Sequence, residues 1–244
     1  MIVAWLSLFD GVLAVALMVV GVGGAHFGLV AAMAGFRLFQ LGFWIGTFGF
    51  FAGLLALGAT WHASNRGALV RALWGLLLSA AMALPAGLVI FRALSAHYPL
   101  INDIVTDPRH PLEFAAVGGL SPAGAAKPYP AGFAALQRSA YGELSALKLA
   151  LAPQPAFRQV QALARSTPGW QVTRVDEKTL TLQGVAASRV FRFRDDFVIQ
   201  VRPNPGGGAL VEMRSRSRDG RGDFSVNYRR IAAFFDRLRS LPQR

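Results

Sequence analysis

Arginine recurs at every second position where the sequence reads ALVEMRSRSR. Alternate residues of an extended strand point to opposite faces, so Arg214, Arg216 and Arg218 share one face. Val211 and Met213 point the other way, toward a hydrophobic core. Guanidinium groups bind carboxylates and phosphates through paired hydrogen bonds. The pattern therefore predicts either an anion-binding face or a solvated strand surface whose arginines pair with acids on neighbouring strands.

Other arginines would extend this face. The complete predicted anion- or partner-binding set is Arg192, Arg194, Arg202, Arg214, Arg216, Arg218 and Arg230. The chain carries a net charge of +12, and residues 96–244 account for +9 of it. A lipid phosphate or an acidic protein is the kind of partner that such a surface would bind.

Carboxylates recur beside the arginines. The polar motif residues are Asp103, Thr106, Asp107, Asp195, Asp196, Asp223 and Asn227. Carboxylates brought together by the fold would hold a hard cation such as Ca²⁺ through oxygen ligands. Their spacing matches no known metal loop, so no metal site is assigned. The alternative interpretation is that they pair with the arginines and cap turns, because buried charges need partners.

Several classes of chemistry are excluded by composition. The chain has no cysteine, which excludes disulfides, thiol catalysis and cysteine-ligated metals. Its four histidines lack the spacing of a zinc site. No P-loop, nucleophile elbow or dinucleotide-binding glycine motif is present. The sequence therefore predicts no cofactor and favours a protein that is not an enzyme.

Three apolar runs occupy the first part of the chain, at 3–22, 41–61 and 72–94. Each has the roughly 20 residues that a helix needs to cross the hydrocarbon of a bilayer. No basic residue precedes the first run, so we interpret it as an uncleaved membrane helix. Asp10 interrupts this run and is a functional candidate if it lies inside the span. It would instead lie near the interface if the span begins at Gly11.

The orientation follows from the loops between these runs. The loop after the second run carries Arg66 and Arg71, whereas the predicted loop at 21–40 carries Arg37 alone. Positive charge is enriched on the cytoplasmic side. We therefore expect an inner-membrane protein with a cytoplasmic N-terminus and a periplasmic C-terminal part. Nucleic acid is not an expected partner there.

The sequence divides into three parts. Residues 1–95 predict a three-helix transmembrane region. Residues 96–154 are rich in proline and predict an extended linker with one short helix at 131–144. Residues 155–244 predict an α+β domain, an antiparallel four-stranded meander with flanking helices.

Within that domain a helix at 155–166 precedes the strands, and a second helix ends the chain. The strand pattern at 179–193 changes phase near Gly184, which predicts a bulge or a break. Asp223 or Ser225 would cap the last helix. That helix has four apolar residues at helical spacing: Ile231, Phe234, Phe235 and Leu238.

Four motifs in a fixed order resemble a known family. They are INDIVTDP at 101–108, GW at 169–170, FRDDFVIQV at 193–201 and RSRSRDGRGDFSVN at 214–227. This order resembles the bacterial and plastid family catalogued as domain of unknown function 1499, over about 101–240. The chain departs from it at Asn102, where many members have histidine, and at Ser225, where glycine is usual. The resemblance implies N-terminal membrane helices and an exterior domain, and it implies no particular activity.

The first functional hypothesis is an accessory or assembly subunit of a larger membrane complex, whose basic periplasmic domain binds a protein or lipid partner. Membrane lipid and other membrane-protein subunits are the expected partners. Gly46, Gly49 and Gly53 would let helices pack closely. Two alternatives are a metal-dependent hydrolase that uses the aspartates and a carrier of a lipid- or quinone-like ligand.

Overall fold

The structure is a computed structural model that describes residues 1–244 except 62–64, 116–127, 143 and 243–244. The chain forms two compact units. One consists of Met1–His97 with Arg189–Arg192, and the other of Tyr98–Ser188 with Phe193–Arg244.

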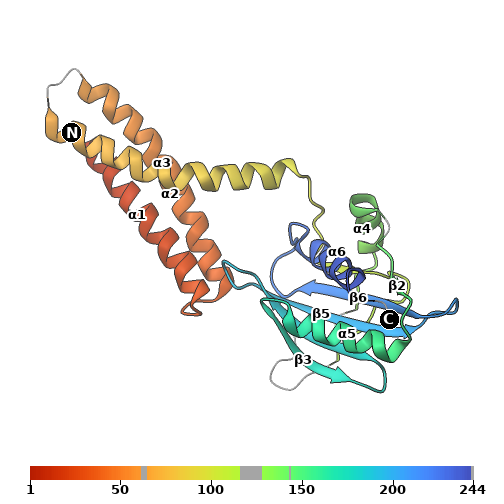
Figure 1. Ribbon diagram of the computed structural model, residues 1–244. Helices are drawn as coiled ribbons and strands as arrows, with labels where there is room; N and C mark the ends of the chain where they lie inside the picture. The colour runs from red at the N-terminus through yellow and green to blue at the C-terminus, as the bar shows by residue number, and fades with distance from the viewer. Residues whose placement is uncertain (62–64, 116–127, 143, 243–244) are drawn as a thin grey trace. The chain divides into compact units, whose positions relative to one another are not determined.

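The first unit is built on a bundle of three helices (Figure 1). They are α1 (Ile2–His26), α2 (Ala32–Trp61) and α3 (Arg66–Ser95). Each is long and apolar enough to cross a membrane, which confirms the three predicted apolar helices. Large apolar side chains such as Trp44, Phe48 and Leu77 are exposed. Small residues fill the contacts between the helices instead, as in helix packing within membranes.

The predicted loop at 21–40 is wrong, because α1 continues to His26 and α2 begins at Ala32. Two glycines of this stretch, Gly21 on α1 and Gly35 on α2, lie where the helices approach very closely. A β-carbon added at Gly35 would lie 2.4 Å from the carbonyl oxygen of Gly21. Glycine is required there by helix contact and not by a turn.

The second unit contains the predicted antiparallel meander. Its strands are β3 (Trp170–Asp176), β4 (Thr181–Ala187), β5 (Arg194–Pro203) and β6 (Ala209–Ser217). Two more short strands, β1 (Asp103–Val105) and β2 (Leu147–Leu149), both pair antiparallel with the outer edge of β6. The stretch predicted as an extended linker thus adds two strands to the sheet.

Two helices cover one face of this sheet, α5 (Pro153–Ser166) and α6 (Val226–Arg239) (Figure 1). The four apolar residues predicted for the last helix are all buried in the core. Val211 and Met213 of β6 lie in the same core, as their parity predicts. Asp223 caps α6, because its carboxylate accepts hydrogen bonds from the backbone N–H groups of Ser225 and Asn227 at 2.9 and 2.8 Å.

The irregularity predicted near Gly184 lies on the neighbouring strand. The register shifts in β3 between Val172 and Arg174, opposite Gly184. A β-carbon at Gly184 would lie 2.4 Å from Cζ of Phe197, so the residue leaves room for that ring. Strand β4 itself ends at Ala187.

The short helix α4 (Phe133–Tyr141) packs against β1 through a polar residue. Leu136, an apolar residue of this helix, is 47% exposed, whereas Gln137 is buried. The Gln137 amide donates to the carbonyl of Val105 at 2.8 Å and accepts from its N–H at 3.1 Å. The side chain therefore takes the place of a neighbouring strand at the open edge of β1.

Candidate functional site

Arg214 lies on the face of β6 opposite the helices, as predicted, but this face is not open to solvent there. Arg214 is 2% exposed. Its Nε and Nη2 donate to the two carboxylate oxygens of Asp103 at 3.0 and 2.8 Å. Its Nη1 donates to the carbonyl of Leu112 at 2.7 Å, and the Phe114 ring lies 4.9 Å from its guanidinium carbon. Residues after β1 cover this face, so Arg214 is neither an open anion site nor a solvated surface residue.

Two further predicted pairs are largely buried. Arg218 donates from Nη2 and Nε to the carboxylate of Asp196 at 2.7 and 3.0 Å. Burial raises the pKa of Asp196 above its usual 3.8, against the opposing effect of Arg218. Arg230 donates from Nη2 to a carboxylate oxygen of Asp195. Arg216 has its Nε 3.9 Å from a carboxylate oxygen of Asp103.

Asn227 links β6 to the start of α6. Its side-chain oxygen accepts from the hydroxyl of Ser215 at 2.7 Å and from Arg230. Its side-chain nitrogen donates to the hydroxyl of Ser217 at 3.0 Å and to the carbonyl of Asn102 at 3.2 Å. Motif residues from distant parts of the sequence therefore meet in one hydrogen-bond network. Among the described residues, no three His, Asp or Glu side chains gather in a way that would hold a metal ion.

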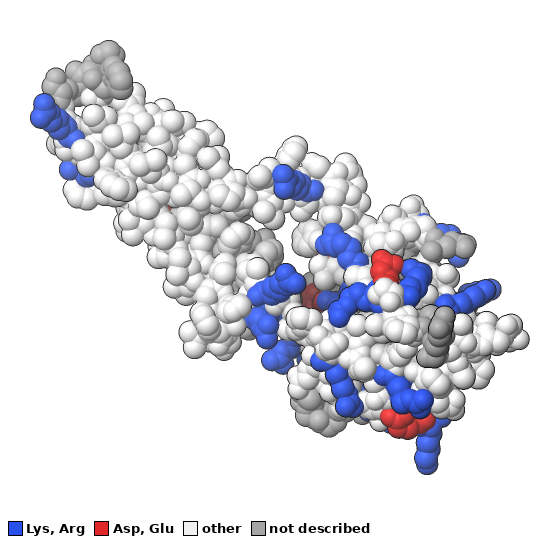
Figure 2. All heavy atoms as spheres, in the orientation of Figure 1, with Lys and Arg blue, Asp and Glu red and all other residues white. Residues whose placement is uncertain are grey.

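Three of the predicted arginines remain at the surface. Arg192 and Arg194 are exposed, and the side chain of Arg202 is half exposed. Figure 2 shows lysine and arginine spread over the visible face of the C-terminal domain and not gathered in one stripe. A continuous arginine face is therefore absent from the visible surface that the structure describes.

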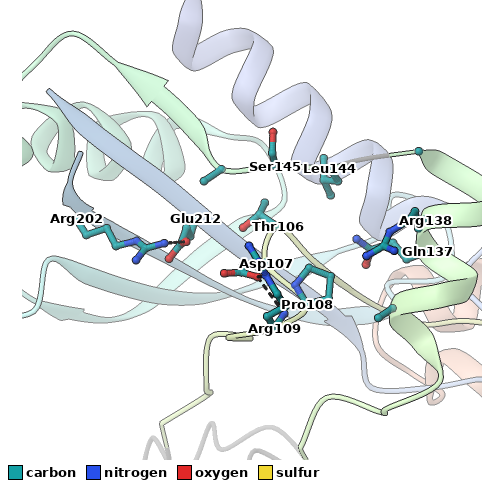
Figure 3. Close-up of a pocket in the computed structure, with 13 residues that line it drawn as sticks. Thr106, Asp107, Pro108, Arg109, Gln137, Arg138, Leu144, Ser145, Arg202 and Glu212 are labelled. Carbon is teal, nitrogen blue, oxygen red and sulfur yellow. Dashed lines mark hydrogen bonds and ion pairs between the residues drawn. The ribbon is translucent and has the colours of Figure 1, made fainter. Parts of the chain in front are cut away.

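A pocket of about 450 Å³ opens at the edge of the sheet, in the interval between β1 and β2 (Figure 3). The two strands pair with different parts of β6, at 214–216 and at 209–211, and therefore leave a gap between them. The loop after β1, helix α4 and strands β5 and β6 supply its walls. The polar residues that matter most are Thr106, Asp107, Arg109, Arg138, Arg202 and Glu212.

Hydrogen bonds fix the inner wall of the pocket. The Thr106 hydroxyl accepts a hydrogen bond from the N–H of Met213 at 3.0 Å. Asp107 accepts from the backbone N–H of Arg109 at 3.0 Å and contacts Nδ1 of His110 at 3.2 Å. Burial opposes ionisation of Asp107, but these contacts outweigh it and hold its pKa below 3.8. Asp107 is therefore ionised at neutral pH.

The charges around the pocket are unevenly matched. Glu212, which is buried, pairs with Arg202, and Asp107 lies 3.6 Å from Nε of Arg109. Arg138 is exposed on α4, and no carboxylate of the residues that the structure describes lies within ion-pairing distance of it. Among the described residues, Arg138 is thus a guanidinium group of the pocket without a carboxylate neighbour.

Sequence reasoning placed Thr106, Asp107 and Arg202 among the candidates but missed Arg109 and Arg138. Arg138 falls on a short amphipathic helix, where an exposed arginine has no distinguishing pattern. Only the pairing of β1 and β2 with one edge of β6 brings these residues together, and the sequence contains no signal for that pairing.

A family model described as a protein of unknown function (DUF1499) matches residues 103–238, more than half of the chain. The match includes β1, the pocket wall, the meander and most of α6. A comparison with curated proteins finds no match for this chain.

Proposed function

The chain belongs to the DUF1499 family, and on that premise we propose that it is a membrane-anchored binding protein without catalytic activity. Its three apolar helices anchor it in the inner membrane, with the N-terminus in the cytoplasm and the C-terminal domain in the periplasm. The domain binds an acidic group of a protein partner in the pocket between β1 and β2. The chain thereby serves as an accessory or assembly subunit of a larger membrane complex.

The observation that carries this proposal is the available guanidinium group of Arg138. Both described carboxylates of the pocket already have arginine neighbours, since Arg202 pairs with Glu212 and Arg109 lies beside Asp107. A carboxylate that enters the pocket would form a charge-assisted, two-pronged hydrogen bond with Arg138. Such pairs are among the stronger contacts in protein interfaces.

The mixed charge of the pocket favours a protein over a lipid headgroup. A peptide could offer its N–H groups to Asp107 and Glu212 and its acidic side chain to Arg138, whereas a phosphate group has no N–H to offer them. The pocket volume of about 450 Å³ is enough for a few side chains. Arginine is enriched at such interfaces and lysine is depleted.

The experiment is site-specific photo-crosslinking of the full-length protein in native membranes. The crosslinker is placed at exposed Ser139, next to Arg138. We expect a protein adduct that disappears with Arg138→Glu, because the reversed charge repels the acidic group. Arg158→Glu is the matched control, since Arg158 is exposed on α5 away from the pocket. It should leave the adduct unchanged.

An adduct that survives Arg138→Glu would overturn this proposal, and an adduct formed only with lipid would favour the lipid alternative. Once the partner's acidic residue is mapped, its replacement by arginine should restore the adduct with the Arg138→Glu variant. Reporter fusions at the C-terminus test the orientation separately. A reporter active only in the cytoplasm would contradict the periplasmic placement.

A further inference from the structure

A single carboxylate lies within the helix bundle, that of Asp10 on α1. It is about 12 Å from the start of the helix, at 1.5 Å per residue. The helices that pack against it extend further: Gly49 lies about 18 Å from the end of α2, and Ser79 about 20 Å from the start of α3. With a hydrocarbon layer about 30 Å thick, this position is inside the layer and not at its edge.

Asp10 faces the contact between the other two helices. A β-carbon placed on Gly49 would lie 2.8 Å from Cβ of Asp10 and 2.6 Å from the hydroxyl oxygen of Ser79. The Asp10 side chain and the Ser79 hydroxyl are therefore near the same point. Glycine at position 49 leaves the space in which they approach each other.

Both groups lack a hydrogen-bond partner among the residues described. Oδ2 of Asp10 is buried without a partner, and so is the hydroxyl of Ser79, whose residue is 0% exposed. The neighbouring Ser7 differs, because its hydroxyl donates to the carbonyl of Gly49 at 3.1 Å. Two unpaired polar groups on adjacent helices thus meet in an otherwise apolar bundle.

None of the cations described in the bundle is placed to neutralise Asp10. On α3, Arg71 lies about 12 Å along the helix from Ser79, and its guanidinium group lies over the ring of Trp5, 4.6 Å from the ring centre. Arg92 is about 20 Å beyond Ser79 on the same helix. On α2, Arg37 lies about 18 Å from Gly49.

The other described titratable groups of the bundle lie at the helix ends, among them the N-terminal amino group of Met1. His26 is the last residue of α1, and Arg66 is the first residue of α3. None of the described charged residues makes an ion pair with Asp10.

We propose that Asp10 and Ser79 form a proton-binding site inside the membrane, in which Asp10 carries an exchangeable proton. An unpaired carboxylate at this depth is costly, because no water is there to solvate its charge. A neutral carboxyl group removes this cost and supplies an O–H donor for the Ser79 hydroxyl oxygen. The inference rests on the membrane anchoring proposed above and is independent of the pocket in the C-terminal domain.

Carbodiimide labelling of the full-length protein in native membranes tests this site. The O–H of a protonated carboxyl adds across a C=N bond of N,N′-dicyclohexylcarbodiimide, so that its oxygen bonds to the central carbon and its proton moves to nitrogen. Rearrangement then gives a stable N-acylurea. At neutral pH an aqueous carboxylate is ionised and unreactive. We expect mass spectrometry to find the adduct at Asp10. The labelled fraction should decrease as the pH rises, and Asp10→Asn should give no adduct at this position.

Three controls make the result decisive. Ser79→Ala removes the proposed acceptor and should shift the pH dependence of labelling without abolishing it. A water-soluble carbodiimide should label Asp10 poorly; equal labelling by both reagents would show an exposed carboxyl and overturn the proposal. Protection by Na⁺ at constant pH and ionic strength would also overturn it, in favour of a cation site.

The membrane premise is tested apart from the proton site by extraction at alkaline pH. Release of the protein from the membrane would contradict the anchoring. Retention with no label on Asp10 would contradict the proton site alone. Infrared spectroscopy of wild type against Asp10→Asn provides a second measurement, because the protonated and ionised carboxyl groups absorb at different frequencies.

Discussion

Arg214 on β6 and Asp103 on β1 form two parallel hydrogen bonds, of 3.0 and 2.8 Å, with both side chains 2% exposed or less. The pair joins residues that are 111 positions apart and attaches the short strand β1 to the meander. Such a pair differs from a surface salt bridge, because removal of either partner leaves a charge without solvent.

We expect Arg214→Met to lower the free energy of unfolding by about 3–5 kcal/mol, since it leaves Asp103 buried and unpaired. The measurement is denaturant unfolding of the full-length protein in detergent, followed by tryptophan fluorescence. Combining it with Asp103→Leu should recover much of the loss. Arg239→Met is the control, because its pair with Asp236 is exposed and worth about 1 kcal/mol or less. Equal effects at the two sites would contradict this interpretation.

The sequence predicted which residues of β6 point to each face of the sheet. It did not predict that other residues cover the face opposite the helices. Alternation placed Val211 and Met213 in the core and Arg214 opposite, and the structure agrees. Leu112 and Phe114 cover that face at Arg214. They belong to residues 106–115, whose sequence has no periodicity that predicts a packed segment. The buried face of α6 could be predicted, because its apolar residues recur at helical spacing.

The pocket was less predictable than the fold, because it depends on a polar contact. Helix periodicity in α4 favours an apolar buried face, yet the open backbone groups of Val105 bind Gln137. An open strand edge is a property of the sheet and not of the helix sequence. Arg138 is brought to the pocket by this contact.

Gln137 is therefore the residue on which the position of α4 depends. We expect Gln137→Leu to cost about 1–3 kcal/mol, because the N–H and C=O of Val105 would lose their partner while still buried. Slow hydrogen exchange at the Val105 amide should become fast in this variant. Leu136→Gln is the control, since Leu136 is exposed and its replacement should change the stability by about 0.5 kcal/mol or less. Unchanged protection of Val105 in Gln137→Leu would contradict the assignment.

Stability should depend on pH through Asp223. Burial raises its pKa above 3.8, although Asn227 and Ser225 donate hydrogen bonds to it. The folded protein then holds this proton more tightly than the unfolded chain. The resulting stabilisation is present at low pH and is lost as the pH rises from 3.8 through the raised pKa. We expect the difference in unfolding free energy between wild type and Asp223→Asn to fall over that interval.

Asp107 provides a control of opposite sign. Its pKa lies below 3.8, so its contribution is present above 3.8 and is lost as the pH falls through the lowered pKa. The difference between wild type and Asp107→Asn should therefore rise with pH. Denaturant unfolding on both sides of pH 3.8 measures both differences. The same slope for both variants would contradict these assignments.

Because the helices of the bundle lie close together, we expect alanine to destabilise the protein at one glycine and not at another. A β-carbon at Gly75 would lie 2.4 Å from the hydroxyl oxygen of Ser7, 2.5 Å from its carbonyl carbon and 2.6 Å from the nitrogen of Leu8. Two of these atoms are backbone, so a side-chain rotation cannot relieve the overlap. Gly75→Ala must push α3 away from α1, at a cost of about 1–3 kcal/mol.

Gly58 provides the matched control, because a β-carbon there would meet nothing within 4 Å. Gly58→Ala should be neutral or stabilise α2 by up to about 1 kcal/mol through helix propensity. Unfolding of the bundle in mixed detergent micelles, followed by circular dichroism, compares the two variants. Because the same methyl group is added to a helix in both, a loss of stability confined to Gly75→Ala measures the helix contact itself. Equal stability of the two variants would mean that α1 and α3 do not approach as closely as the structure shows.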